Sequence, residues 1–469
     1  MQAGDGRRPG YDWLRSSSMV PNVRKAIYFG CYGSRVRGWP TAQVYRSMVR
    51  QDRIGVPTSL QRDRLAAILV HCRRNVPYYA GLMAHDQDCV KDPERYLREL
   101  PILTRDHLRT RFDELKSADL SRRQWWINSS GGSTGQPVCF IQDREYEAYS
   151  FATTLLFYNW AGYDFGEPQT RLWGATRDLF REKVTWRTRL YDYVVNVSYL
   201  NAFRMTPEKM REYLAILNQR PPKLLVAYAQ ALYEVARFAQ REGIAVQPQR
   251  AIMTSAGTLY PFMREVIEGV FRCRVYNRYG SREVGDIASQ CAALQGLHVS
   301  PWTEYVEIVD EQGRPMPPGA EGDILVTSLS NYAMPLIRYK IGDRGILAPE
   351  AGCSCGRHGQ VLAKVTGRIT DNFRARTGRV IPGEYFIHMI GVVLNGGAIK
   401  QFQVRQTSYD QIVLKIAKTE PEAMIDIQEI VSKIQFVMDD PCEVRVELVD
   451  AIPPEASGKY RYTISEVQG

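Results

Sequence analysis

The feature that most constrains the fold is an alternation of strand-like and helix-like runs through the middle of the chain. Each strand-like run is short and apolar, whereas each helix-like run spaces its apolar residues three or four positions apart. Strands that alternate with helices pack as α/β layers, so we expect an α/β fold. The strand-like runs are 223–229, 250–256, 305–310 and 323–328, and the helix-like runs are 231–242 and 261–271.

The character of the sequence changes near residue 368. Strand-like runs at 400–406 and 411–418 are followed by a helical run at 421–438 and a further strand-like run at 443–449. These elements predict a small α+β unit with its own apolar face. The expected organisation is a flexible tail over 1–20, a large α/β domain over 21–367 and a small mobile domain over 368–469.

The segments before this region also carry local signals. Helical spacing over 60–74 stops before Pro77, and Thr104 is a plausible N-cap for a short helix. The run 125–130, WWINSS, predicts a strand that leads into a glycine-rich turn.

Basic residues gather at the N-terminal end. Residues 1–80 contain 14 Lys and Arg against 4 Asp and Glu, which accounts for the whole formal charge of +10, so the rest of the chain is balanced. Such a region is commonly a solvated face or arm, but it also suits an anionic partner such as a membrane surface or an acidic polymer. No zinc-finger spacing or aromatic RNA-binding signature accompanies it, so nucleic acid is not an expected partner.

Two further absences bear on location. No segment approaches the ~18 consecutive apolar residues of a membrane helix, and residues 1–20 hold no apolar signal core. A cytoplasmic location is therefore the expectation.

The glycine-rich segment Ser129–Pro137, SSGGSTGQP, is the strongest candidate for chemistry. Its three glycines let the backbone approach a ligand closely, and its N–H groups and hydroxyls can surround a polyphosphate. It lacks the Gly-Lys-Ser/Thr ending of a Walker A loop. A Gly/Ser-rich turn alone is more often an ordinary loop, so this motif needs support from the rest of the chain.

That support comes from a resemblance. SSGGSTGQP resembles the phosphate-binding loop of the adenylate-forming superfamily of acyl-CoA synthetases, adenylation domains and luciferases. In that family's order, Tyr279–Glu283 resembles its Tyr-Gly-x-Thr-Glu segment and Arg338–Asp343 its Tyr/Arg-x-Thr-Gly-Asp segment. Gly367-Arg368 resembles the Gly-Arg at its hinge, and Ser457–Lys459 its Ser-Gly-Lys. Upstream, NVPYY and LPILTRDHLR are similar to the phenylacetate–CoA ligase branch, in particular to relatives encoded in capsule or exopolysaccharide loci.

The resemblance implies that ATP converts a carboxylic acid to an acyl-adenylate. Both reactants are anions, so catalysis needs positioning and neutralisation of charge. Glu283 would hold Mg²⁺, a hard cation that prefers oxygen ligands, while Thr134 and Lys459 complete the catalytic set. Asp343 suits the ribose hydroxyls and Tyr279 offers an aromatic face to the nucleotide. The implied ATP-binding residues are Ser129, Ser130, Gly131, Gly132, Ser133, Thr134, Gly135, Gly257, Tyr279, Gly280, Ser281, Asp343 and Arg368.

Candidates for the acid-binding pocket are fewer. Tyr228 and Ala229 resemble the family's strand-to-helix segment near the substrate, and Ala256 precedes the segment between acid and adenine. Trp173 is a further candidate. The alternative for each is an ordinary core position.

The sequence is compatible with two acceptors of the acyl group, an amine and the thiol of coenzyme A. Arg282 replaces a small Thr and could pair with Glu283 or reach substrate or phosphate, and Thr370 stands where the hinge usually carries Asp or Lys. Since hinge rotation in this family brings about thiol transfer, a divergent hinge favours an amide ligase that transfers the acyl group to an amine, on a sugar or amino acid in polysaccharide modification. An acyl-CoA ligase using coenzyme A is the alternative, and a non-catalytic scaffold is the third reading.

A second constellation consists of Cys291, His298, Cys353 and Cys355. Zinc favours four tetrahedral N and S ligands, and a closed Cys3His set is structural in type. Some members of the phenylacetate–CoA ligase branch resemble this pattern and carry a zinc there. His358 is the reserve ligand, and the alternative is scattered core cysteine with a satisfied histidine.

Overall fold

The protein is described here from a computed structural model. The structure describes residues 23–29, 38–57, 59–82, 85–129, 138–173, 193–202, 205, 207–255, 257–349, 353–367, 373–376, 380–381, 383–390, 398–438, 442–453 and 462–467.

A single eleven-stranded sheet runs through the large domain in the order β10-β11-β12-β13-β9-β8-β7-β6-β5-β3-β4. The five strands from β7 to β4 are parallel, and the remaining pairs are antiparallel. The strands are β3 Gln169–Trp173, β4 Val197–Asn201, β5 Leu224–Tyr228, β6 Ile252–Ser255, β7 Val275–Ser281, β8 Gly285–Ser289, β9 Leu297–Val299, β10 Glu304–Val309, β11 Glu321–Ser328, β12 Tyr339–Leu347 and β13 Val361–Gly367. The parallel half is the α/β layer that the alternating runs predicted.

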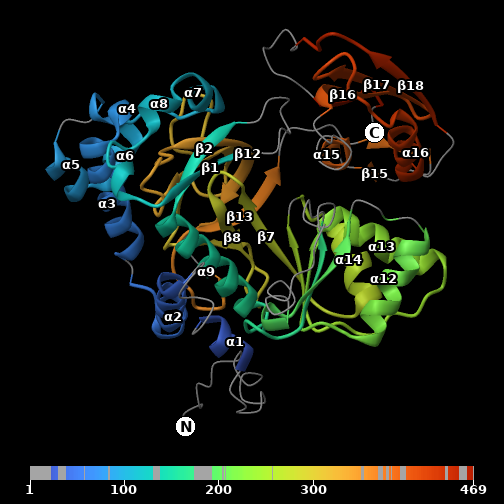
Figure 1. Cartoon of the computed structure of the whole chain (residues 1–469), viewed down its shortest axis with the longest axis horizontal. Coiled ribbons are helices and arrows are strands. Elements are labelled where there is room, and N and C mark those ends of the chain that lie inside the picture. The colour runs from blue at the N-terminus through green and yellow to red at the C-terminus, as the bar shows by residue number, and fades with distance from the viewer. Residues whose placement is uncertain are drawn as a thin grey trace, which may run out of the picture.

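Helices cover this sheet in two groups (Figure 1). Beside the parallel strands lie α12 Pro207–Gln219, α13 Ala229–Arg241 and α14 Pro261–Phe271, which bury apolar side chains with those strands in one core cluster. At the opposite end lie α3 Leu60–Asn75, α4 Pro77–Ala80, α5 Asp86–Lys91, α6 Pro93–Glu99, α7 Arg105–Thr110, α8 Phe112–Leu115 and the 3-10 turn η3 Leu120–Arg122. The elements α1 Val23–Ile27, α2 Gly38–Ile54 and α9 Arg144–Trp160, and the hairpin β1 Trp125–Ser129 with β2 Cys139–Asp143, complete the domain.

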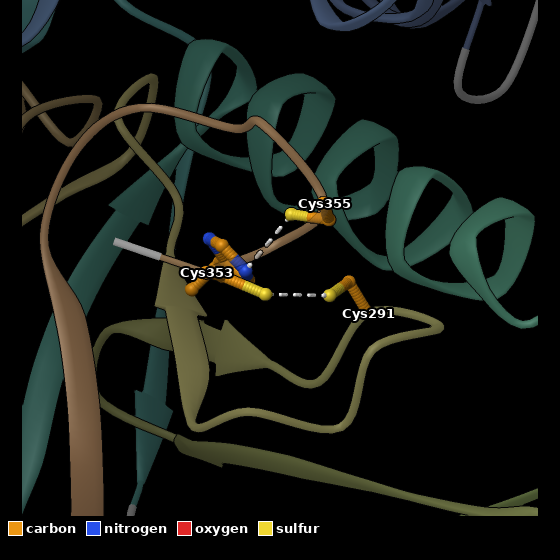
Figure 2. A group of neighbouring side chains, drawn as sticks. Cys291, Cys353 and Cys355 are labelled. Carbon is orange, nitrogen blue, oxygen red and sulfur yellow. Dashed lines mark hydrogen bonds between the residues drawn. The ribbon is translucent and has the colours of Figure 1, made fainter. Parts of the chain in front are cut away.

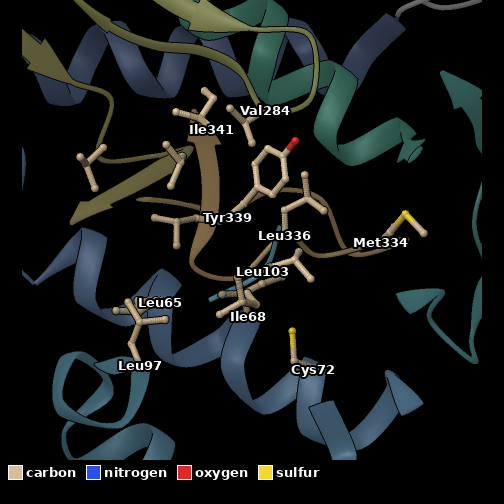
Figure 3. Packing of buried hydrophobic residues seen from close by; sticks show 14 of the residues in the cluster. Leu65, Ile68, Cys72, Leu97, Leu103, Val284, Met334, Leu336, Tyr339 and Ile341 are labelled. Atoms are coloured by element: carbon tan, nitrogen blue, oxygen red, sulfur yellow. The ribbon is translucent and has the colours of Figure 1, made fainter. Parts of the chain in front are cut away.

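A short parallel bridge joins the helical end to the sheet. The Leu103 N–H donates to the carbonyl of Arg338 at 3.1 Å, and the Lys340 N–H donates to the carbonyl of Leu103 at 2.9 Å. Leu103 and Tyr339 are fully buried in the same core, where Tyr339 stands beside Val284 (Figure 3). This bridge fixes the start of α7 against β12.

The C-terminal residues form a separate unit, which confirms the expected fold class of a large α/β domain with a small α+β domain. Its sheet has the order β18-β17-β16-β19 and packs against its own helices. The elements are β14 Phe373–Arg374, β15 Val380–Ile381, α15 Gly383–His388, β16 Ile399–Ser408, β17 Gln411–Lys418, α16 Ile427–Met438, β18 Glu443–Leu448 and β19 Thr463–Ser465. The unit lies beside α13, where Arg241 stacks over the ring of Phe436 at 5.5 Å (Figure 1).

Most local expectations agree with the described elements. The helix expected over 60–74 is α3, and Thr104 caps α7 by accepting from the His107 N–H. The helix expected from residue 421 was wrong at its start, because α16 begins at Ile427. Asp426 accepts from the Glu429 N–H at 2.9 Å, so its side chain caps the first turn there. The expected boundary at Arg368 lies outside the described residues and stays a prediction.

Candidate functional site

Two residues assigned to the nucleotide meet in the structure. The Tyr279 hydroxyl donates a 2.9 Å hydrogen bond to Asp343 Oδ2. Tyr279 lies in β7 and Asp343 in β12, strands that are not neighbours in the sheet. Both side chains are half-buried. The pair therefore places an aromatic face beside carboxylate oxygens that can accept hydrogen bonds from hydroxyls.

Glu283, the expected magnesium ligand, lies in the loop between β7 and β8 and is 3% exposed. Its Oε1 atom accepts from the Tyr339 hydroxyl at 3.5 Å and lies 3.5 Å from Arg105 Nη2. Burial, followed by the Glu283 charge, raises the pKa of Tyr339 to about 12, so the phenol keeps its proton and donates. A buried carboxylate with a cation and a phenol beside it is a site that can bind charged groups.

Arg105 is the residue that sequence reasoning missed. In the sequence it belongs to LPILTRDHLR, the segment that is similar to the phenylacetate–CoA ligase branch. Thr104 caps α7 and makes Arg105 its first helical residue, while the Leu103 bridge presses this turn against Tyr339. Burial would lower the pKa of Arg105, but nearby Tyr339 and Glu283 outweigh it and raise the pKa. A cation directly after an N-cap was the only signal available in the sequence.

The glycine-rich segment over 129–137 is described only at its first residue. Ser129 ends β1, and its carbonyl accepts from Arg282 Nη1 at 3.2 Å. Arg282 thus ties the Tyr279–Glu283 segment to the start of the loop, and Glu283 has Arg105 as its cationic neighbour. Ser281 Oγ is enclosed and has no hydrogen-bond partner in the described structure. Gly280 is required sterically, because a Cβ there would lie 2.4 Å from the Gly285 carbonyl oxygen.

The acid-pocket candidates partly converge. The rings of Trp173 and Tyr228, at the ends of β3 and β5, lie 4.1 Å apart between centroids. Ala229 is fully buried at the first residue of α13. Gln230 was not among the residues expected from the sequence. It is 7% exposed, and its Nε2 atom is enclosed without a described partner. A Cβ on Gly257 would lie 2.2 Å from Gln230 Oε1, so this glycine makes room for the amide.

The four Cys and His residues come together as expected (Figure 2). Their ligand atoms all lie within 4.8 Å of one another. Cys291 Sγ is 3.5 Å from Cys353 Sγ, and Cys355 Sγ is 3.4 Å from His298 Nε2. These spacings suit a tetrahedral zinc, since zinc–sulfur bonds of ~2.3 Å place two sulfurs roughly 3.8 Å apart. The Cys291 thiol, then His298, lowers the pKa of Cys355, which favours the thiolate form that binds metal.

Other assigned residues lie outside the described part of the chain. They are Ser130, Gly131, Gly132, Ser133, Thr134, Gly135, Ala256, Arg368 and Lys459. Their roles remain those that the resemblance implies.

Comparison with known proteins places this geometry in a family. The family described as the CapK C-terminal domain matches residues 373–466. Protein CapK of Staphylococcus aureus is 22% identical over 87% of this chain and 89% of its own. A phenylacetate-coenzyme A ligase of Thermus thermophilus is 25% identical over 77% of this chain and 82% of its own. The chain belongs to the adenylate-forming ligases, in the branch of phenylacetate–CoA ligase and CapK.

The fold of this adenylate-forming ligase agrees with solved relatives. A structure of 2-hydroxyisobutyryl-CoA ligase with 2-HIB-AMP and CoA in the thioesterification state aligns with a TM-score of 0.57, at 17% identity, over 89% of this chain and 90% of the other. Within the described residues of the ligase, none of the helices is both long and apolar enough to cross a membrane.

Proposed function

We propose that this ligase activates a carboxylic acid with ATP to an acyl-adenylate and then transfers the acyl group to an amine. The observation that carries the proposal is the convergence of Glu283, Arg105 and Tyr339 with the Tyr279–Asp343 pair. These residues lie far apart in the sequence, and β12 supplies both Tyr339 and Asp343. A carboxylate for a metal, a cation for phosphate and acceptors for ribose are the groups that joining two anions requires.

Each residue has a role that its surroundings support. Glu283 would hold Mg²⁺, which would supply positive charge to the phosphates, and Arg105 would then be available to a phosphate oxygen. Tyr279 orients Asp343 toward the ribose hydroxyls through their 2.9 Å hydrogen bond. Ser129–Gly135 would enclose the phosphates, with Thr134 as the catalytic hydroxyl. Lys459, in the domain over 368–469, would neutralise the charge that grows as pyrophosphate leaves.

A structural zinc belongs to the same proposal. Cys291, His298, Cys353 and Cys355 provide a complete and largely buried donor set, and the described cysteines are all free thiols. A closed set of four leaves no position for substrate, so the ion would stabilise the fold rather than take part in catalysis.

The choice of acceptor rests on the hinge. The divergent Thr370 favours an amine, on a sugar or amino acid in polysaccharide modification. The likeness to phenylacetate-coenzyme A ligases supports a second candidate, transfer to coenzyme A. Because hinge rotation in this family brings about thiol transfer, the divergent hinge weighs against the coenzyme A route.

The test is pyrophosphate release by the purified full chain with a panel of aryl and aliphatic acids. We expect at least one acid to support release without coenzyme A, and hydroxylamine to capture its acyl group as a hydroxamate. Consumption of the adenylate by amines but not by coenzyme A supports the amide ligase, and the reverse supports the thiol ligase. If no acid supports release, the scaffold reading replaces both.

A further inference from the structure

The outward face of α2 is cationic. Arg46, Arg50 and Arg53 lie on successive turns of one face, and all three are exposed. None of the ion pairs found among the described residues involves these three arginines. Like charges in such a row repel one another, a cost that an anionic partner would offset.

The inner face of α2 is held firmly. Tyr45 and Met48 are buried, and the helix packs on α9. Asp52, the one acidic residue of α2, accepts two hydrogen bonds from Arg357 at 2.8 and 2.9 Å and one from Trp160 Nε1 at 3.2 Å. Its negative charge is therefore turned inward and neutralised, so the charged side chains that α2 exposes are all arginines.

The same anchor reaches the Cys and His cluster. Arg357 stacks over Trp160 at 4.5 Å, and its backbone N–H points at Cys355 Sγ at 3.4 Å. Trp160 in turn contacts the edge of His298. The Cys and His cluster thus stabilises the inner face of α2, so the helix that carries Arg46, Arg50 and Arg53 is held in place.

Apolar groups accompany the cations. Ile54 follows Arg53 at the end of the same exposed face and is 74% exposed. Nearby α1 contributes Val23, 60% exposed, and Arg24, which lies over the exposed ring of Tyr193. Figure 1 shows α1 and α2 together at one end of the molecule, away from the C-terminal domain. Exposed aliphatic and tyrosine side chains suit the interfacial region of a bilayer, whereas an acidic polymer offers them nothing to bury in.

We propose that α2, with Ile54 and the neighbouring α1, is a docking surface for an anionic lipid membrane. The contact is peripheral, with the arginines at the headgroups and the apolar side chains between them. Each Arg near an anionic surface strengthens binding by roughly fivefold at low salt, so three together contribute about 100-fold.

The experiment is co-sedimentation of the full chain with vesicles of phosphatidylcholine alone or with 30 mol% phosphatidylglycerol, a composition of about one anionic lipid in three. The test variant is Arg46→Gln/Arg50→Gln/Arg53→Gln. The matched control, Arg95→Gln/Lys209→Gln/Arg445→Gln, removes the same charge from side chains that are 78%, 52% and 73% exposed elsewhere. Equal thermal midpoints of both variants establish that they are folded.

We expect binding only to the anionic vesicles, about 100-fold weaker in the test variant and within threefold in the control, and abolished by high salt. Ile54→Ser should weaken binding further without changing its salt dependence. Equal binding by the test variant and the native chain overturns the proposal, as does an equal loss in the control. Binding to polygalacturonate but not to vesicles overturns it in favour of a polymer. None of these outcomes depends on which acid or acceptor the ligase uses.

Discussion

Replacing Arg105 with Ala tests whether the charge pair at the site is as important as its burial indicates. Arg105 Nη2 lies 3.5 Å from Glu283 Oε1, and the two side chains are 18% and 3% exposed. At an effective dielectric constant of about 20, unit charges at this distance attract by about 5 kcal/mol. Removing one partner of a buried pair costs about 3–5 kcal/mol, because the other charge stays buried without it.

We expect Arg105→Ala to lower the free energy of unfolding by about 3 kcal/mol. This is the lower end of the range for a broken buried pair, because the Tyr339 hydroxyl still donates to Glu283. Urea unfolding followed by tryptophan fluorescence measures this value. Arg109→Ala is the matched control on the same helix. Arg109 pairs with the exposed Asp106, so its loss should cost less than about 1 kcal/mol.

A double-mutant cycle separates the pair from general damage to α7. If the loss arises from an unpaired carboxylate, Arg105→Ala/Glu283→Gln should be more stable than Arg105→Ala alone. In the pyrophosphate assay, Arg105→Ala should slow release by about 10²–10³-fold, and Arg105→Lys should restore part of it. Native stability in Arg105→Ala, or no recovery with Glu283→Gln, would refute the reasoning.

Three of the remaining predictions rest on the structure, and one, on Lys459, rests on the family resemblance. Lys459→Ala should reduce the rate of pyrophosphate release by about 10²–10³-fold, because the contact that Lys459 makes forms mainly in the transition state. ATP binding, measured by calorimetry, should change little. Full adenylation activity in this variant would contradict the role of Lys459. Cys353→Ser should release zinc, measured by elemental analysis, and lower the thermal midpoint before it alters turnover, whereas metal-free native protein would argue against the site. Burial raises the pKa of Glu304 well above its usual value, so the folded state holds the Glu304 proton more tightly than the unfolded state does. Stability is therefore lost as the pH rises from about 4.3 toward the folded pKa. Glu304→Gln should be more stable than the native chain at pH 8 and about equally stable at pH 4, measured by urea unfolding. Gln230→Ala, which leaves the ATP-binding candidate Gly257 in place, should raise the KM for the acid several-fold more than that for ATP. An equal rise in both would place Gln230 outside the acid site.

Much of the fold could be predicted from local patterns in the sequence. Hydrophobic periodicity over 60–74 gave α3, and the Thr104 hydroxyl gave the start of α7, because these signals act within one or two turns. The Cys and His residues could also be grouped in advance. Only a few residue types bind zinc, and the Cys-x6-His and Cys-x-Cys spacings set Cys291, His298, Cys353 and Cys355 apart from the other cysteines and histidines. The start of α16 was predicted too early, because a helical pattern of apolar residues does not show at which residue a cap such as Asp426 begins the helix.

Contacts between distant segments were decided only by the tertiary structure. Arg105 and Glu283 are 178 residues apart, and they meet because a two-bond bridge at Leu103 joins the helical end to β12. Asp52 and Arg357 are 305 residues apart, and their pairing decides that α2 turns its arginines outward. Spacing along the chain specifies which residues share a helix face or a strand, but not which faces pack together, because that depends on how the whole core closes. The sequence by itself therefore determined most of the elements and the grouping of the four Cys and His residues, and the packing of the sheet and its helices decided which charges meet.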